Sequence, residues 1–272
     1  MLHWFRDRRR KKLLEQPFPD GWDKLISHNL AHDAWLDEAE RGRLRDLTRI
    51  FVAEKKWEGC GGLVLEDEIR VTIAANACLL ILGRSDDLYR NVRSILVYPS
   101  TVVIPERQAG AFEVPRGDAR GPIPILGEAQ LRGPVILVWD AVQHQARHPE
   151  RGHNVVFHEF AHKLDMRDGG VDGTPPLESR DEYRRWVEVC EREYRSLRER
   201  AEKGQRSLLD VYGATNEAEF FAVATELFFD QPISMRKRYA DLYEILQAFY
   251  RQDPAARVER RCGAPERRET DP

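Results

Sequence analysis

The pentapeptide His158-Glu159-Phe160-Ala161-His162 combines residue types that can bind a metal ion and move a proton. On a helix, residues four apart lie on the same face about one turn apart, so both imidazoles can approach one ion. Zinc binds neutral imidazole nitrogens well, and it lowers the pKa of bound water to about 7. Glu159 is turned about 100° from His158 and can accept a proton beside the metal. These residues predict hydrolysis, in particular of amides.

A surface helix with two histidines is the alternative interpretation of this pentapeptide. Its neighbours are apolar, however, and include Val155, Val156, Phe157 and Leu164. Two histidines and a glutamate need partners when they are buried. The context therefore favours a metal site.

A third metal ligand is expected on the C-terminal side. A catalytic zinc usually has three protein ligands and one open position. The segment NEAEFFAVATE, which begins at Asn216, contains Glu217, Glu219 and Glu226. On a helix Glu226 returns to within about 20° of Glu219, whereas Glu217 lies about 160° away. Glu219 is either a metal ligand or the third residue of a capping box that begins at Asn216. Glu226 is a supporting residue on the same face, and Glu217 can stay in solvent.

The elements that must position these residues indicate an α+β domain with a small mixed sheet. Apolar spacing predicts helices over residues 34–57, 76–82, 153–165, 179–203, 216–230 and 235–252. Short apolar runs predict strands over residues 69–75, 94–99, 101–105 and 133–142. We expect a basic N-terminal extension over residues 1–18, a single domain over 19–252 and a polar, mobile tail over 253–272.

Composition excludes several classes of protein. Lys and Arg number 43 against 46 Asp and Glu, and the net charge of −3 argues against nucleic-acid binding. The 4 cysteines contain no C-x-x-C pair, which fits a reducing cytoplasm. No apolar run suits a secretory signal or a membrane span, so we expect a cytoplasmic protein without stable membrane insertion. The basic cluster from Arg6 to Lys12 suits an anionic membrane surface or an acidic partner, and a solvated terminus is the preferred interpretation.

Three segments together resemble the Mlc titration factor A family of zinc metallopeptidases: HEFAHKLD, the following DGGVDGTPP, and YGATNEAEFFAVATELFF. The C-terminal half is also similar to the catalytic domain of anthrax lethal factor, a zincin. The resemblance implies a zincin-like fold with an active-site helix and a helical C-terminal part. It also implies one zinc ion per chain, held by His158, His162 and Glu219, with Glu159 as general base and Tyr212 as hydrogen-bond donor to the oxyanion.

Two candidate site residues and one predicted strand each have an alternative interpretation. Without the resemblance, Tyr212 is a packed aromatic residue at the start of a helix. Asp165 shares the helix face of both histidines and either orients an imidazole or has a role at the end of the helix or in the following turn. The strand over residues 133–142 either pairs with an extended substrate or lies in the core.

The resemblance implies an aminopeptidase-like zinc enzyme that acts on peptide substrates. The alternative is a regulatory binding protein that sequesters a transcriptional repressor of the Mlc type and thereby affects glucose uptake. A structural zinc in a non-enzyme would need a fourth protein ligand. No cysteine lies near the motif, which counts against that third interpretation.

Overall fold

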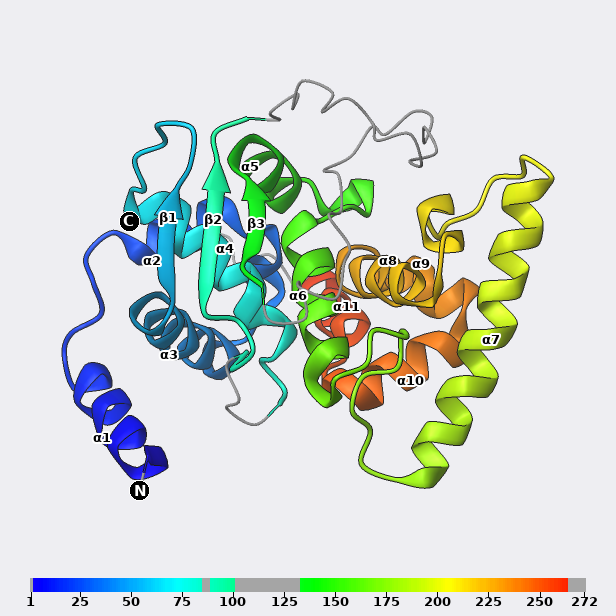
Figure 1. Cartoon of the computed structure of the whole chain (residues 1–272), viewed down its shortest axis with the longest axis horizontal. Helices are drawn as coiled ribbons and strands as arrows, with labels where there is room; N and C mark the ends of the chain where they lie inside the picture. The colour runs from blue at the N-terminus through cyan, green and yellow to red at the C-terminus, as the bar shows by residue number, and fades with distance from the viewer. Residues whose placement is uncertain (1, 85–88, 101–132, 264–272) are drawn as a thin grey trace, which may run out of the picture.

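Three short parallel strands form the sheet of this protein (Figure 1). The computed structural model describes residues 2–84, 89–100 and 133–263. The strands are β1 (Lys56–Gly59), β2 (Ser94–Tyr98) and β3 (Val135–Val138), in the order β1-β2-β3. Ile95 and Val97 of β2 pair with Val135 and Leu137 of β3, and all four side chains are buried. The predicted α+β fold with a small sheet is confirmed.

The sheet differs from the prediction in direction and extent. The sequence pattern predicts a mixed sheet, whereas the three described strands all run parallel. Parallel neighbours need a crossover, and helix α4 (Asp67–Leu80) lies in the connection from β1 to β2. The strand expected over residues 133–142 ends at Val138, where helix α5 (Trp139–Arg147) begins. The strand expected over residues 101–105 lies outside the described residues.

Helix α4 corrects the prediction of a strand over residues 69–75. Ile69, Val71 and Ile73 alternate with other residues and are β-branched, which locally favours a strand. In the structure every residue from Val71 to Leu80 is buried, so the helix is covered on all sides. A helix buried all round has no polar face to reveal its period of 3.6 residues. Tertiary packing here overrides local preference.

Three α-helices in the described part of the chain precede β1, and the first of them lies at the lower left, apart from the strands (Figure 1). They are α1 (Leu2–Leu14), α2 (Trp22–Asn29) and α3 (Glu38–Glu54). Helix α3 begins with a complete capping box between Asp37 and Glu40. It packs against α4, which contributes much of the apolar core.

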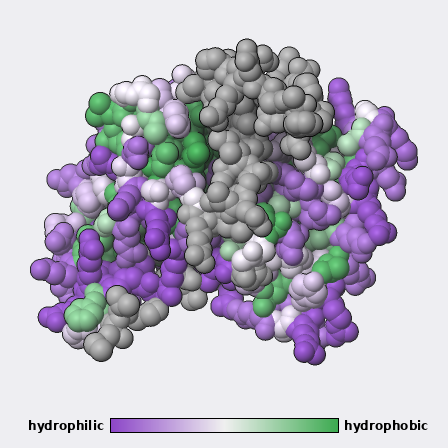
Figure 2. All heavy atoms as spheres, viewed as in Figure 1, coloured by the Kyte–Doolittle hydropathy of each residue, from purple (hydrophilic) through white to green (hydrophobic). Residues whose placement is uncertain are grey.

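The C-terminal half is helical, as predicted. Its helices are α6 (Val155–Asp165), α7 (Arg180–Glu202), α8 (Glu217–Asp230), α9 (Pro232–Arg238), α10 (Ala240–Tyr250) and α11 (Pro254–Gly263). The single helix expected over residues 235–252 is interrupted at Tyr239, whose backbone leaves the helical region. The outer side of α7 is mostly hydrophilic in Figure 2, as its charged sequence predicts.

Helix α11 differs from the polar, mobile tail expected after Asp253. Asp253 caps the helix by accepting a hydrogen bond from the backbone of Ala256 at 3.0 Å. Ala255 is fully buried, and Arg257 pairs with Glu40 of α3 at 2.8 Å. Buried small side chains and ion pairs with distant residues hold this helix, which its polar composition does not reveal.

Helix α6 lies between the sheet and the C-terminal helices (Figure 1). It packs against α8 on one side and against α4 and β3 on others. Phe157 of α6 meets Phe229 of α8 with ring centres 5.5 Å apart. The two helices are therefore held side by side by apolar contacts. Among the described helices, none has the length and apolar character to cross a membrane.

Candidate active site

The start of helix α6 is held by a chain of buried hydrogen bonds. The Asn154 side chain accepts from the backbone N–H groups of Val156 and Phe157, both at 3.1 Å, which caps the helix. Its amide donates to Asn76 of α4 at 3.0 Å, and its backbone N–H donates to Glu226 of α8 at 2.7 Å. The rotation of α6 about its axis is thereby fixed relative to both neighbours.

This arrangement brings together three of the predicted site residues, His158, His162 and Glu219. The Nε2 atom of His158 lies 2.9 Å from Oε2 of Glu219, and that of His162 lies 3.5 Å from the same oxygen. The two Nε2 atoms are 3.2 Å apart. One ligand atom from each residue lies within 4.8 Å of the others, so the three atoms can surround one cation.

Glu219 is the third residue of α8, as the capping-box interpretation requires, but only the hydrogen bond to the Asn216 side chain is present and its own side chain faces elsewhere. Its backbone N–H donates to the Asn216 side chain at 2.9 Å, so Asn216 is the N-cap of α8. Its carboxylate is only 1% exposed and points toward the two imidazoles. Glu217, by contrast, is exposed at the start of the helix.

Glu226 orients His158 from the side opposite the ligand atoms. Its Oε1 lies 2.7 Å from Nδ1 of His158, and its Oε2 accepts the backbone N–H of Asn154. A carboxylate on Nδ1 favours the tautomer in which Nδ1 carries the proton and Nε2 keeps its lone pair. Glu226 thus presents the His158 nitrogen that faces Glu219 in a form that can bind a metal.

The electrostatics of this cluster suit a cation. Burial by itself lowers the pKa of His158, but hydrogen bonds to Glu219 and Glu226 raise it well above 6.5. Burial by itself raises the pKa of Glu219, but hydrogen bonds to His158 and His162 lower it to about 2. Two carboxylates therefore favour positive charge at this point. Two imidazoles and one carboxylate also match the donors of catalytic zinc sites.

Asp165 is placed differently from the predicted contact with a ligand imidazole. It is fully buried, and its Oδ2 accepts the backbone N–H of Gly173 at 3.0 Å. The Nδ1 atom of His162 has no hydrogen-bond partner among the described residues. Asp165 therefore fastens the loop after α6, which was the other interpretation of its position.

That loop connects α6, α7 and α8 through Gly173. Its carbonyl accepts a hydrogen bond from Trp186 of α7 at 3.1 Å, and its φ of +74° favours glycine. A Cβ at this position would lie 2.3 Å from the carbonyl oxygen of Glu217. The close approach holds the start of α8, and hence Glu219, next to the end of α6.

Tyr212 lies in a short 3-10 turn, Val211–Ala214, above the cluster. Its side chain is 41% exposed, and its ring centre lies 6.0 Å from that of His158. Asp210 accepts the backbone N–H of Tyr212 at 2.7 Å and caps the turn. The phenol is therefore not a packed core residue. Glu159 follows His158 on α6 and is partly exposed.

His153 belongs to this environment although its sequence position did not indicate it. Its Nε2 lies 3.4 Å from Asp210, and its Nδ1 lies 4.0 Å from Glu226. It thus connects the turn that carries Tyr212 with the carboxylate behind His158. Asn154 had a sequence signal, because an Asn directly before an apolar helical run is a typical N-cap. The Asp210 contact with the Tyr212 N–H is likewise a recognisable Asx-type turn.

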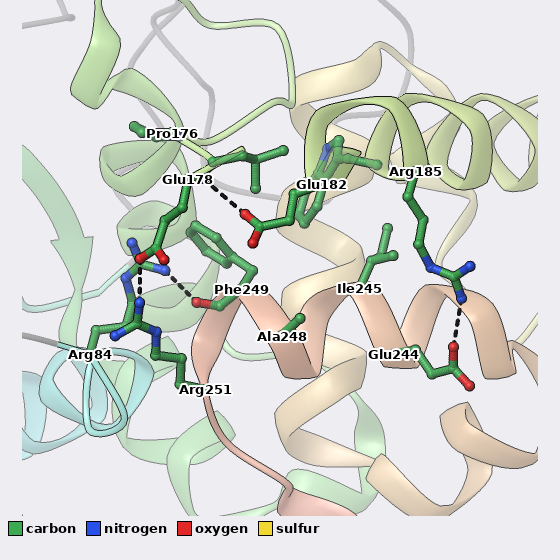
Figure 3. A pocket seen from close by; sticks show the side chains of 12 residues that line it. Arg84, Pro176, Glu178, Glu182, Arg185, Glu244, Ile245, Ala248, Phe249 and Arg251 are labelled. Atoms are coloured by element: carbon green, nitrogen blue, oxygen red, sulfur yellow. Dashed lines mark hydrogen bonds and ion pairs between the residues drawn. The ribbon is translucent and has the colours of Figure 1, made fainter. Parts of the chain in front are cut away.

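A hollow lies apart from this cluster, between α7 and α10 (Figure 3). Arg251 pairs with Glu178 there, and Arg185 pairs with Glu244 at 2.6 Å. Arg84 lies over the Phe249 ring at 4.3 Å. These charged groups satisfy one another, and no member of the His158 cluster lines the hollow.

Comparison with known proteins agrees with this geometry. The family model described as glucose-regulated metallo-peptidase M90 matches residues 4–251. The chain belongs to this metallopeptidase family. It is 36% identical to an uncharacterized protein of Synechocystis over 254 residues, covering 93% of this chain and 90% of the relative. It is 32% identical to Mlc titration factor A of Serratia proteamaculans over 228 residues, covering 83% and 85%. The Yersinia pestis protein of the same name is 29% identical over 246 residues, covering 88% and 87%.

The family assignment confirms the resemblance seen in the sequence segments. A metallopeptidase needs a metal, and His158, His162 and Glu219 form a group in the described part of the chain that can hold one. The matched range extends from α1 to the end of α10, so it includes every predicted site residue.

Proposed function

We propose that this metallopeptidase uses one zinc ion per chain, held by His158, His162 and Glu219, to hydrolyse peptide bonds. The observation that carries the proposal is the convergence of two Nε2 atoms and one carboxylate oxygen beside a glutamate and a tyrosine. When bound, zinc would polarise the scissile carbonyl and lower the pKa of water toward neutrality. Nitrogen and oxygen donors in this number support zinc over calcium or magnesium.

Glu159 is the proposed general base. It accepts a proton from water as the water oxygen bonds to the carbonyl carbon, and it passes this proton to the amine as the C–N bond breaks. The Tyr212 phenol donates a hydrogen bond to the carbonyl oxygen, where negative charge develops. Glu226 keeps His158 in the tautomer that leaves its Nε2 lone pair available.

Replacement of the base and of the third ligand tests this assignment. Glu159→Gln should retain the zinc stoichiometry of the wild type and lose about 10²- to 10⁴-fold in kcat on a peptide substrate. Glu219→Ala should lose zinc as well as activity. Metal content measured by atomic emission, together with peptide hydrolysis, checks both. Full activity of Glu159→Gln would refute the mechanism, and full zinc content of Glu219→Ala would refute the ligand set.

Aminopeptidase activity is the proposed specificity, and it rests on the family resemblance. Peptides with free N-termini should be cleaved faster than the same peptides with acetylated N-termini. Equal rates for the two would assign the enzyme to endopeptidases instead. We propose the cytoplasm as the site of action, and we propose residues 19–252 as the peptidase domain, with α11 packed against it.

A second proposed function is regulatory binding of a transcriptional repressor. The name of the Serratia and Yersinia relatives, Mlc titration factor A, favours this function. Capture of an Mlc-type repressor by the purified chain would support it. If Glu159→Gln captures the repressor as well as the wild type does, this binding is independent of catalysis. Absence of capture by both would reject this function and leave the peptidase proposal intact.

A further inference from the structure

Helix α1 carries two exposed aromatic residues and a dense group of basic residues. Trp4 is 59% exposed and Phe5 is 61% exposed. Between residues 6 and 12 the sequence RDRRRKK has six basic residues and one acidic residue. Arg8, Arg9, Lys11 and Lys12 are also exposed. We define Trp4, Phe5 and these four basic residues as the α1 outer surface.

The opposite side of α1 is attached to the protein. Arg10 forms two hydrogen bonds with the carboxylate of Glu54 at the end of α3, both at 2.7 Å. Leu13 and Leu14 are partly buried against the core. Positions 6, 10, 13 and 14 follow the i, i+4, i+7, i+8 spacing of a single helix face. The docked side of α1 is therefore fixed, and the outer surface cannot turn inward without breaking these contacts.

The α1 outer surface has its own helical spacing. Positions 4, 8, 11 and 12 repeat the i, i+4, i+7, i+8 pattern of one helix face. Position 5 lies seven residues before position 12 and therefore on the same side of the helix. The guanidinium of Arg8 lies 5.5 Å from the Trp4 ring centre, which places a cation and an aromatic ring on the same side. Figure 1 shows α1 at the lower left, away from the C-terminal helices.

We propose that the α1 outer surface adsorbs the protein to a membrane that contains anionic lipids. Aromatic side chains favour the boundary between headgroups and acyl chains, and Lys and Arg side chains pair with anionic headgroups. A duplex nucleic acid or a polyanionic peptide would pair with the basic residues alone, whereas the boundary of a membrane also takes up two adjacent aromatic side chains. The aromatic residues therefore favour lipid as the partner.

The charge of the remaining chain fixes the orientation on such a membrane. The whole chain has a net charge of −3, so the part outside α1 is more negative than this value. An anionic surface attracts α1 and repels the rest, which keeps the protein on the surface without burying its body. This inference does not depend on the proposed peptidase activity.

Sedimentation with lipid vesicles tests the proposal on the full chain. Vesicles of phosphatidylglycerol mixed with phosphatidylcholine should bind the protein, and vesicles of phosphatidylcholine alone should bind it weakly. Replacement of the four basic residues (Arg8, Arg9, Lys11 and Lys12) by Gln should weaken binding by several hundredfold, since each is worth about fivefold. Binding should also fall when the salt concentration is raised from about 0.1 M to about 1 M.

Two further variants make the test specific. Trp4→Ser with Phe5→Ser should weaken vesicle binding at least about tenfold, because two apolar side chains lose their burial. A control variant replaces Arg184, Arg195 and Arg198 on the exposed side of α7, and Lys203 directly after it, by Gln. It should bind vesicles as the wild type does. All variants should keep the wild-type thermal unfolding midpoint, because the replaced side chains are exposed. They should also hydrolyse a soluble peptide at the wild-type rate, because none of them touches the proposed site.

Three outcomes would overturn the proposal. The first is absence of binding to the anionic vesicles. The second is equal loss of binding in the α7 control, which would indicate a general effect of charge. The third is unchanged vesicle binding of the Trp4→Ser, Phe5→Ser variant together with equally tight binding to polyglutamate or duplex DNA. That result would make α1 a general polyanion site and not a lipid site.

Discussion

Replacement of Glu226 by Gln tests how the protein prepares its metal site. Glu226 accepts two hydrogen bonds, from Nδ1 of His158 and from the backbone N–H of Asn154, both at 2.7 Å. The Gln amide has one oxygen and one NH₂ group, so it can accept only one of these bonds. If its oxygen stays on Asn154, its NH₂ group faces Nδ1 of His158.

The NH₂ group then requires Nδ1 of His158 to be an acceptor. The imidazole proton moves to Nε2, which is the nitrogen proposed to bind the metal. Loss of a carboxylate that supports a ligand histidine typically costs about 10- to 100-fold in metal affinity, which corresponds to about 1.4 to 2.7 kcal/mol. We expect Glu226→Gln to weaken zinc binding by this factor.

Competition for zinc with a chromophoric chelator measures this affinity directly. Glu217→Gln is the matched control, because Glu217 is exposed at the start of the same helix and should have wild-type affinity. Thermal unfolding of the metal-free proteins separates loss of affinity from loss of fold. If folded Glu226→Gln binds zinc as tightly as the wild type, the tautomer argument is wrong.

Three further predictions concern the proposed oxyanion donor, the loop and the ion cluster. Tyr212→Phe should lower kcat by about 10²- to 10³-fold with an unchanged KM and zinc content; an unchanged kcat would remove Tyr212 from the mechanism. Gly173→Ala should lower the free energy of unfolding in urea by more than Gly169→Ala does. Both positions have positive φ, where alanine costs about 1 to 3 kcal/mol, but only at Gly173 would the new Cβ meet a backbone atom. Equal losses of unfolding free energy would contradict the close approach at Gly173. In the metal-free protein, the stabilising contribution of His158 is complete below pH 6.5 and is lost as the pH rises through its elevated pKa. The stabilising contribution of Glu219 is complete above pH 4.5 and is lost as the pH falls toward its lowered pKa of about 2. The wild type should therefore exceed Glu219→Gln in unfolding free energy most between pH 4.5 and 6.5, and a difference that does not vary with pH would refute the charge assignment.

Much of the fold was predictable where one side of an element faces solvent. The helices α6 and α7 and the strand β2 follow the predicted ranges closely, because their apolar residues repeat with a clear period. The helix predicted over residues 34–57 was too long at both ends, since α3 covers Glu38–Glu54 and Lys56 and Trp57 belong to strand β1. Helix α4 was not predictable, because burial on all sides removes that period. Helix α11 was missed because its contacts come from distant segments: α9, the 3-10 helix Ala31–Trp35 and Glu40 of α3.

The candidate site, like the fold, was predictable only in part. The spacing of His158, Glu159 and His162 depends only on helix geometry, which is local and therefore readable in the sequence. The positions of Glu219 and Glu226 relative to the imidazoles depend on how α8 packs against α6, which involves residues more than sixty positions apart. Helix periodicity placed both glutamates on one face, but it did not say what that face meets.

The sequence by itself determined which residues were candidates: the pentapeptide from His158 to His162, the proposed proton acceptor Glu159 and a short list of third ligands. Only the tertiary structure decided that the carboxylate of Glu219 meets the imidazoles while its backbone is capped by Asn216. It also decided that Glu226 supports His158 and that Asp165 fastens the Gly173 loop. The physical reason is that hydrogen bonds between distant segments exist only after the apolar surfaces of α6 and α8 have packed together.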